Sequence, residues 1–328
     1  MTYGEGYGPL AIAHRGGSAL APENSLAAFE LASGLGLRYL ETDIRVTGDG
    51  HLVCFHDDTL ERVTSATGPV RSKSLRDLRA LRINGIESIP TFDEALDAFP
   101  NQCFTVDVKD QAGIAPLVKS LQRKGVAQRV CIAGAWDGWL GQVRGAVPEV
   151  TTALGWRSLS ALLLCVQTGV RPPRALATAP FAHVPVKVGR IPIFAERLVA
   201  MSHDIGVRVV TWTVDEPAEI RRLLDAGVDA IITDRPDVLR EVLVSRNQWA
   251  PMGSRREAPP SPDPRCPSTP KVHVRAHNTT PGTHHPVTVT LLYCKREGSR
   301  HIRVLPPAHQ RRHRLGAPGS QALAQDRP

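Results

Sequence analysis

Residues 208–244 read RVVTWTVDEPAEIRRLLDAGVDAIITDRPDVLREVLV. Two short apolar runs, Arg208–Trp212 and Ala230–Thr233, have the composition of strands that are buried on both faces. Each run is followed by a stretch in which apolar residues recur at helical spacing, Glu216–Ala226 and Asp237–Val244. A glycine directly after the first of these stretches is typical of a helix end. The segment therefore predicts two successive strand–helix units.

The same alternation extends back to the N-terminus. Further strands are predicted at Leu10–Ala13, Arg38–Asp43, Phe104–Val108, Arg129–Ala133, Thr151–Leu154 and Ala182–Val186. Further helices are predicted at Ser25–Gly34, Thr91–Ala98, Ile114–Lys124, Trp136–Val143, Leu159–Gln167 and Ile193–Asp204. Eight such units in one α/β domain favour a closed TIM (β/α)₈ barrel, with an open doubly wound sheet as the alternative.

A small hairpin is predicted after the second strand. Val46–His51 has the residues of a turn, and Leu52–Phe55 is an extended run that returns from it. Folding this turn pairs residues whose numbers add up to about 97 or 98. That register brings His56 opposite Glu41 or Thr42.

The composition changes abruptly after Val244. Residues 1–244 carry 26 Lys and Arg against 28 Asp and Glu, a net charge of −2, whereas residues 245–328 carry +10. We therefore predict a barrel domain at 1–244 and a basic Pro/Arg/His-rich tail at 245–328. A disordered tail without a specific role and a frame-shifted C-terminus are both open, and a tail that binds an anionic polymer or metal is a third alternative.

Several classes of protein are disfavoured. Only 5% of the residues are aromatic and the barrel is not basic, so we expect no nucleic-acid binding by the barrel. No apolar window approaches the length of a membrane span, and the N-terminus lacks the order of a secretory signal. The six cysteines form no CxxC pair, which favours free thiols. We therefore predict a cytoplasmic protein, and the sequence leaves its oligomeric state open.

Polar side chains gather where the predicted strands end. The first strand is followed by His14 and Arg15, at the rim where barrel enzymes hold their sites. On the second strand, Glu41 and Asp43 are two apart and face the same way, as do Asp107 and Lys109 after the third barrel strand. Each feature has a purely structural alternative, such as a surface ion pair or a histidine that bonds only backbone.

Together these residues suit the cleavage of a phosphodiester. Two inward carboxylates are costly side by side unless a proton or a cation bridges them, and a hard divalent cation prefers oxygen ligands. Arginine and lysine neutralise a phosphate, while His14 and His56 can move protons. Asp107 adds a third carboxylate to the set.

The motifs resemble the glycerophosphodiester phosphodiesterase family, within the PLC-like phosphodiesterase superfamily. Residues 14–36, HRGGSALAPENSLAAFELASGLG, and 40–64, LETDIRVTGDGHLVCFHDDTLERVT, are similar to its opening signature. The later blocks SIPTFDEAL, VDVKD, VVTWTVDEP and AGVDAIITDRPD extend the likeness over roughly residues 9–240. The resemblance implies a TIM barrel, one bound Mg²⁺ or Ca²⁺, and hydrolysis of glycerophosphodiesters to glycerol 3-phosphate and an alcohol.

The resemblance also implies roles for single residues. His14 and His56 would be the catalytic acid–base pair. The implied metal ligands are Glu41, Asp43 and Asp107. The implied substrate contacts are Arg15, Lys109 and Trp212, and Trp212 would lie on the glycerol side. Glu23 and Asn24 would support the cluster from behind. Asn24 or Ser25 is also a candidate cap of the next helix.

The chain departs from the family pattern at three positions. Asp107 stands where glutamate is usual and is shorter by about 1.5 Å, one C–C bond length. Asp215 stands where asparagine is frequent, and Ala230 where glycine is. We expect changes in packing or affinity from these, without loss of activity, and we interpret His183 and His203 as structural.

The expected reaction begins with attack of the neighbouring glycerol hydroxyl on phosphorus, and water then opens a cyclic phosphate. Direct attack by water is the alternative. A lysophospholipase D-like phosphodiesterase of the same superfamily is a rival function, disfavoured because no exposed apolar or aromatic loop is evident in the sequence. A non-catalytic barrel that binds a phosphate ligand is the second rival.

Overall fold

The computed structural model describes residues 2–5, 8–188, 191–192 and 195–249. Its elements follow the predicted alternation. The strands are β1 Leu10–Ala13, β2 Tyr39–Val46, β3 Leu52–Cys54, β4 Cys103–Val108, β5 Val130–Ala133, β6 Thr151–Thr152, β7 Phe181–Pro185, β8 Lys187–Val188, β9 Ile191–Pro192, β10 Arg208–Trp212 and β11 Ala230–Thr233. The helices are α1 Leu26–Gly34, α2 Leu75–Arg79, α3 Phe92–Ala98, α4 Ile114–Leu121, α5 Asp137–Ala146, α6 Trp156–Thr168, α7 Ala195–His203, α8 Pro217–Asp225 and α9 Pro236–Ser245.

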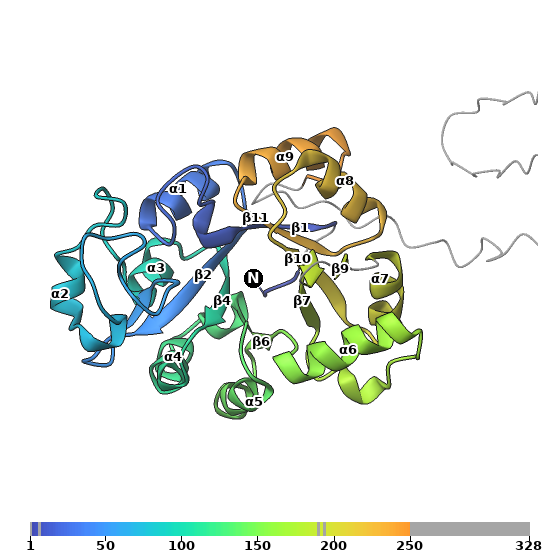
Figure 1. Cartoon of the computed structure of the whole chain (residues 1–328), viewed down its shortest axis with the longest axis horizontal. Coiled ribbons are helices and arrows are strands. Elements are labelled where there is room, and N and C mark those ends of the chain that lie inside the picture. The colour runs from blue at the N-terminus through green and yellow to red at the C-terminus, as the bar shows by residue number, and fades with distance from the viewer. Residues whose placement is uncertain (1, 6–7, 189–190, 193–194, 250–328) are drawn as a thin grey trace, which may run out of the picture. The chain divides into compact units, whose positions relative to one another are not determined.

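Eight of the strands form a parallel barrel. They are hydrogen-bonded in the order β6-β5-β4-β2-β1-β11-β10-β7. The two end strands meet through a parallel bridge between Ala153 and Phe181, where Leu154 N donates to Phe181 O at 2.7 Å. Figure 1 shows the helices arranged around this ring. The predicted TIM barrel is thus confirmed, and the open doubly wound sheet is wrong because its edges would not meet.

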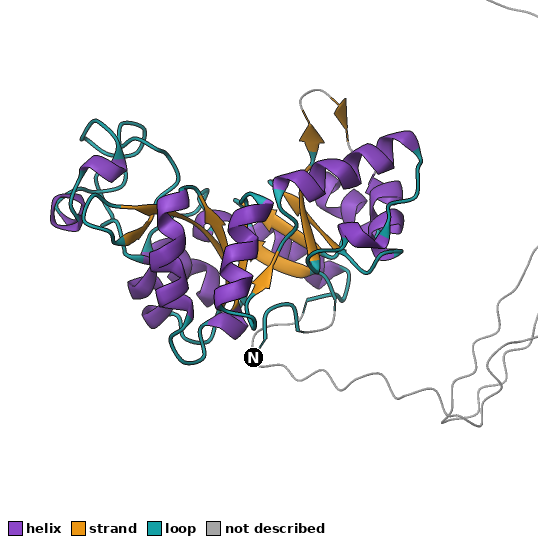
Figure 2. Ribbon diagram, turned by 90° about the horizontal axis from the view of Figure 1, so that it is seen from below, coloured by secondary structure: helices purple, strands orange, loops and turns teal. Residues whose placement is uncertain are grey.

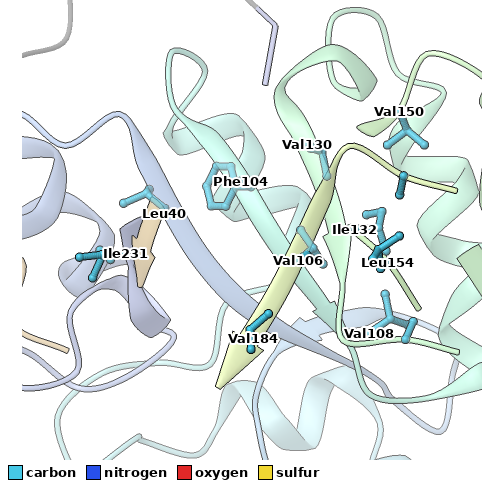
Figure 3. Close-up of a cluster of buried hydrophobic side chains, with 14 of the residues drawn as sticks. Leu40, Phe104, Val106, Val108, Val130, Ile132, Val150, Leu154, Val184 and Ile231 are labelled. Atoms are coloured by element: carbon cyan, nitrogen blue, oxygen red, sulfur yellow. The ribbon is translucent and has the colours of Figure 1, made fainter. Parts of the chain in front are cut away.

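Alternate residues of each strand enter two different apolar layers. On β4, Phe104, Val106 and Val108 pack in the layer between the strands and the helices, where Figure 3 shows them. Cys103 lies in the separate cluster inside the barrel, and Asp107 lines the pocket at its mouth. A period of two residues per strand produces this division, and it is why site residues occur two apart.

The N-terminus closes the inner cluster from the strands' N-terminal end. Tyr3 is only 4% exposed and packs edge-on against Tyr39 and Phe181. Its hydroxyl hydrogen-bonds Thr105 Oγ1 at 2.5 Å, and burial raises the pKa of the Tyr3 hydroxyl well above its usual range. No core residue was expected in this polar, glycine-rich segment.

The hairpin after β2 is confirmed. β3 pairs antiparallel with β2 through Ile44↔Cys54 and Val46↔Leu52, so the paired numbers add up to 98. Continuing that register sets His56 opposite Thr42, one of the two predicted partners. The chain then runs through a small apolar cluster of its own, which includes Val53, Phe55 and Leu60.

Several bounds differ from the predictions. α6 begins at Trp156, three residues before the predicted Leu159, and α2 was not predicted at all. α2 begins after Ser74, whose side chain and Asp77 form a reciprocal capping box. Figure 2, viewed from below, shows the helices packed outside the central strands.

The described part of the chain ends beyond the predicted domain boundary at 244. α9 continues to Ser245, and Trp249 packs against the outer apolar layer with Arg240 stacked near its ring. The prediction that residues 245–328 form a disordered tail concerns residues that lie almost wholly outside the described part. Within that part, no helix has the length and hydropathy that crossing a membrane would require.

Candidate active site

A pocket of about 350 Å³ lies at the C-terminal ends of the barrel strands. Its size is within the range of pockets that bind small molecules. Eight of the ten residues predicted from the sequence line it: His14, Arg15, Glu41, Asp43, His56, Asp107, Lys109 and Trp212. The remaining two, Glu23 and Asn24, lie directly behind these.

His14 is held by a carboxylate from the far end of the domain. Its Nδ1 hydrogen-bonds Asp234 Oδ1 at 2.7 Å, while its Nε2 lies 4.0 Å from Glu41 Oε2. Burial lowers the pKa of His14, but Glu41 and Asp234 outweigh burial, so the net pKa is raised. Asp234 was not among the predicted site residues, although it stands in the quoted block AGVDAIITDRPD.

Arg15 follows in a left-handed conformation, with φ 49°. This conformation is uncommon for a residue with a long side chain, so the surroundings must stabilise it. Its backbone N–H donates to Glu41 Oε2 at 2.8 Å, and its guanidinium donates to Glu23 at 3.0 Å. Arg15 Nε also lies 3.2 Å from Asp43 Oδ2 as an ion pair without hydrogen-bond geometry.

The glycine after Arg15 is required by close packing. Gly16 has φ +82°, and a Cβ there would lie 2.7 Å from Ala28 Cβ and 2.8 Å from Phe29. α1 therefore sits directly on the turn that carries His14 and Arg15. Ser25 caps this helix by accepting from Ala28 N at 3.1 Å, which confirms one of the two predicted caps.

Three carboxylates face the pocket from β2 and β4. Burial and the neighbouring Asp43 raise the pKa of Glu41 to about 7. Burial likewise raises the pKa of Asp107, whereas Lys109 and Arg15 overcome burial at Asp43 and lower its pKa. The cluster therefore holds more buried negative charge than its own cations compensate.

Lys109 bridges two of these carboxylates. Its Nζ lies 2.9 Å from Asp43 Oδ1 and 2.6 Å from Asp107 Oδ2. Burial lowers the pKa of Lys109, but the two aspartates outweigh it and the net pKa is raised. Asp107 Oδ1 is buried without a hydrogen-bond partner.

Asp107 occupies the space that a side chain at residue 134 would need. A Cβ on Gly134 would fall 1.6 Å from Asp107 Oδ1. The shorter carboxylate that distinguishes this chain from the family pattern thus packs against bare backbone. This contact links β4 to the loop after β5.

His56 directly follows the hairpin and also has a carboxylate partner. Its Nδ1 bonds Asp57 Oδ1 at 2.6 Å, and Arg45 Nε donates to the His56 carbonyl at 2.9 Å. Arg62 pairs with both Asp57 and Glu23, which joins the hairpin insertion to the support of Arg15. His14 and His56 therefore each present Nε2 while an aspartate holds Nδ1.

Asn24 supports the second strand from behind. Its Nδ2 donates to Asp43 Oδ2 at 3.0 Å, and its Oδ1 accepts from Thr42 Oγ1 at 2.7 Å. Asn24 is 1% exposed and has φ 56°, a conformation that asparagine adopts more readily than most residues. The placement of Glu23 and Asn24 agrees with the supporting positions expected for them.

The described residues that line the other half of the pocket include no charged side chain. From β5 round to β10 the lining residues are Ala133, Gly134, Ala135, Trp136, Trp139, Leu154, Trp156, Leu159, His183 and Trp212. Four of the chain's five tryptophans are among them. We call Trp136, Trp139 and Trp156 the tryptophan wall. Trp136 is 58% and Trp156 38% exposed, so the expectation of no exposed aromatic loop is wrong.

The remaining sequence expectations have mixed outcomes. His203 bonds Asp229 at 2.8 Å away from the pocket, in agreement with a structural role. His183 instead lines the pocket, and its buried Nε2 has no hydrogen-bond partner. Asp215 Oδ1 accepts from Thr233 Oγ1 and Asp234 N, both at 2.8 Å, which an asparagine oxygen could equally do. Ala230 is fully buried inside the barrel.

The donor set fits a divalent cation, although the side chains do not already form a ligand shell. Two buried carboxylates, Glu41 and Asp43, lie with the partly exposed Asp107, whose Oδ1 has no hydrogen-bond partner, and a hard cation would stabilise such a group. As the side chains stand, no three His, Cys, Asp or Glu among the described residues are placed to hold a metal. Lys109 bridges the two aspartates instead.

Comparison with known proteins identifies the family to which this barrel belongs. A model of the glycerophosphoryl diester phosphodiesterase family matches residues 14–238. "Probable glycerophosphodiester phosphodiesterase 2" of Mycobacterium tuberculosis is 35% identical over 246 residues, covering 74% of this chain and 93% of that protein. A glycerophosphodiester phosphodiesterase of Caldanaerobacter subterraneus is 32% identical, covering 70% of this chain and 96% of that protein.

Solved structures share the fold. A phosphodiesterase of Oleispira antarctica, in complex with the product sn-glycerol-3-phosphate, has a TM-score of 0.61 at 24% identity and covers 72% of this chain and 97% of its own. A glycerophosphodiester phosphodiesterase of Agrobacterium tumefaciens has a TM-score of 0.58 at 23% identity, and the match covers 70% of this chain and 99% of that one. The extent of the family match and the identity to these relatives show that the chain belongs to the glycerophosphoryl diester phosphodiesterase family of enzymes.

Proposed function

We propose that this enzyme hydrolyses glycerophosphodiesters to glycerol 3-phosphate and an alcohol, with one divalent cation bound. The observation that carries the proposal is the common rim of the barrel. Two histidines, Arg15, Lys109 and three carboxylates line one pocket there. The product bound to the Oleispira antarctica phosphodiesterase, sn-glycerol-3-phosphate, supports the same product here.

The cation, Mg²⁺ or Ca²⁺, would be held by Glu41, Asp43 and Asp107. When bound, it would supply positive charge to the phosphate and to the charge that develops on its oxygens. The chain's own cations, Arg15 and Lys109, also supply positive charge to the phosphate. Both are already held beside acidic partners at the pocket.

The two histidines would carry the protons. A histidine takes the proton of the glycerol hydroxyl beside the phosphate as the new O–P bond forms, and the other gives a proton to the alcohol as its O–P bond breaks. Water then opens the cyclic phosphate with the proton roles reversed. Asp234 and Asp57 fix the tautomer and the orientation of the two rings, which leaves both Nε2 atoms available.

The first test is hydrolysis of glycerophosphocholine and glycerophosphoethanolamine by the full chain, with and without EDTA. We expect metal-dependent release of glycerol 3-phosphate. His14→Ala should lower kcat by about 10²–10⁴-fold, the usual contribution of one positioned proton carrier. Absence of turnover with every divalent metal tried would favour the non-catalytic binding alternative.

A second measurement separates the two routes to product. Trapping cyclic glycerophosphate at early times, with ¹⁸O water as solvent, would support attack by the glycerol hydroxyl. If no cyclic species forms at any time while ¹⁸O enters the product, direct attack by water replaces the two-step route.

A further inference from the structure

We propose that the tryptophan wall is the subsite for the leaving alcohol and that it selects an uncharged, apolar alcohol. This inference rests on the proposed function, because it assigns a place to one half of the same diester. Its starting point is the division of the pocket into two arcs. Among the described lining residues, all the charged ones belong to the arc from β1 to β4, and none belongs to the arc from β5 to β10.

The wall is fixed in place by hydrogen bonds. Trp156 Nε1 donates to Gly134 O at 2.9 Å, and Asp137 accepts from Arg157 N at 2.8 Å and from Ser158 Oγ at 2.5 Å. These bonds join the loop that begins α5 to the loop that begins α6, two helices that Figure 1 shows next to each other. The Trp156 indole and the two loops that carry the wall are thus arranged before any substrate binds, which lowers the entropic cost of binding.

The wall adjoins the phosphate site. Gly134, which accepts the Trp156 bond, is the residue whose missing side chain leaves room for Asp107. A group that leaves phosphorus beside Asp107 therefore meets the wall first. Trp212 and His183 stand farther round, on β10 and β7, where Trp212 is expected on the glycerol side and the free His183 Nε2 can bond a hydroxyl.

The strand order places the loops after β5 and β6, which carry the wall, between β4 with Asp107 and β7 with His183. A leaving alcohol beside Asp107 is therefore next to the wall. The half-exposed indoles offer apolar area that an apolar alcohol would cover. Among the described residues, the carboxylates nearest the wall are already engaged: Asp43 and Asp107 pair with Lys109, and Asp137 accepts from Arg157 and Ser158.

The test is a series of glycerol 3-phosphate esters of ethanol, butanol and hexanol, assayed as monomers with the full chain. We expect kcat/KM to rise about twofold to fourfold per methylene, since burying one methylene contributes about 0.8 kcal/mol. The ester of 3,3-dimethylbutanol, a neutral isostere of choline, should be turned over at least as fast as glycerophosphocholine. A clear preference for the choline ester would overturn the proposal in favour of a cation–π site.

The variants are Trp136→Ser and Trp156→Phe, with Ile86→Ser as the control. Ile86 is 67% exposed and lies outside the pocket, so its loss should leave the slope per methylene unchanged. Trp136→Ser should at least halve that slope, while Trp156→Phe keeps a ring and should change it less. A flat series in the unaltered protein, or an equal loss for every ester in Trp136→Ser, would overturn the proposal. Metal-dependent turnover of glycerophosphocholine in those same assays would show that the proposed function survives.

Discussion

At the scale of single residues, the site depends on how each polar group is partnered. His14 and His56 have aspartates at Nδ1, Asn24 supports Asp43, and Lys109 bridges two carboxylates. His183 differs, because it is buried in the pocket lining without a partner for Nε2. Burial alone lowers the pKa of His183 to about 4.

This shift predicts a pH dependence of stability. The unfolded chain titrates His183 near 6.5, so between about pH 6.5 and 4 it binds more protons than the folded chain does. The free energy of unfolding should therefore fall by an amount on the order of 2–3 kcal/mol as the pH falls through that window. It should be fully restored above the window. Chemical denaturation at several pH values would measure it.

The substitutions His183→Leu and His51→Gln separate this contribution from general acid denaturation. Removing the buried imidazole should make the acid slope shallower. Replacing His51, which is exposed in the hairpin turn, should leave the slope as it was. Equal slopes in the unaltered protein and in His183→Leu would contradict the assignment.

At the scale of elements, loops on neighbouring strands hold each other in register. In the loop after β5, Gly134 leaves room for the Asp107 side chain, and the Gly134 backbone oxygen accepts a hydrogen bond from Trp156. Asp137 in the same loop accepts a hydrogen bond from the start of α6. Gly134 has φ +66°, a conformation that favours glycine, and its lack of a side chain leaves the space that Asp107 fills. One glycine therefore connects the charged arc of the pocket with the uncharged arc.

Gly134→Ala should displace the Asp107 carboxylate. We expect the divalent metal concentration that gives half-maximal activity to rise by about tenfold or more, as when an outer support of a metal site is lost. A titration of activity with Mg²⁺ or Ca²⁺ would measure it. Gly169→Ala is the matched control, because Gly169 also has a positive φ but no atom within 4 Å of the added Cβ. A similar metal requirement in both variants would show that Asp107 tolerates the displacement.

At the scale of the whole molecule, distant segments of the chain complete the domain. Tyr3 fills the end of the inner cluster, Asp234 reaches His14 across most of the sequence, and Trp249 packs on the outer layer after α9. The described structure thus continues past the boundary at 244 that the change in composition suggested.

Two truncations test this boundary. A chain ending at Trp249 should keep the activity and thermal stability of the full chain. A chain ending at Val244 loses Trp249 and the end of α9, and should be less stable by about 1–3 kcal/mol, the usual contribution of one large apolar side chain. Thermal unfolding and hydrolysis assays on both would decide. Inactivity of the longer truncation would indicate a functional role for the tail.

The sequence by itself determined the alternation of strands and helices, which polar residues share one face of a strand, and the register of the hairpin to within one residue. These are local properties, since they follow from periods of two and about 3.6 residues and from the turn around Asp49. The resemblance supplied the same rim residues, and the structure brings eight of the ten into one pocket.

Only the tertiary structure decided the contacts between distant parts of the chain. Closure of the barrel sets Asp234 against His14, and packing of two loops sets Trp156 above Gly134. Tyr3 looked like part of a polar, glycine-rich segment, and Trp156 lay outside the predicted helices. No local period specifies such pairs, because which segments meet depends on the closed ring of strands and on the loops that its curvature brings together.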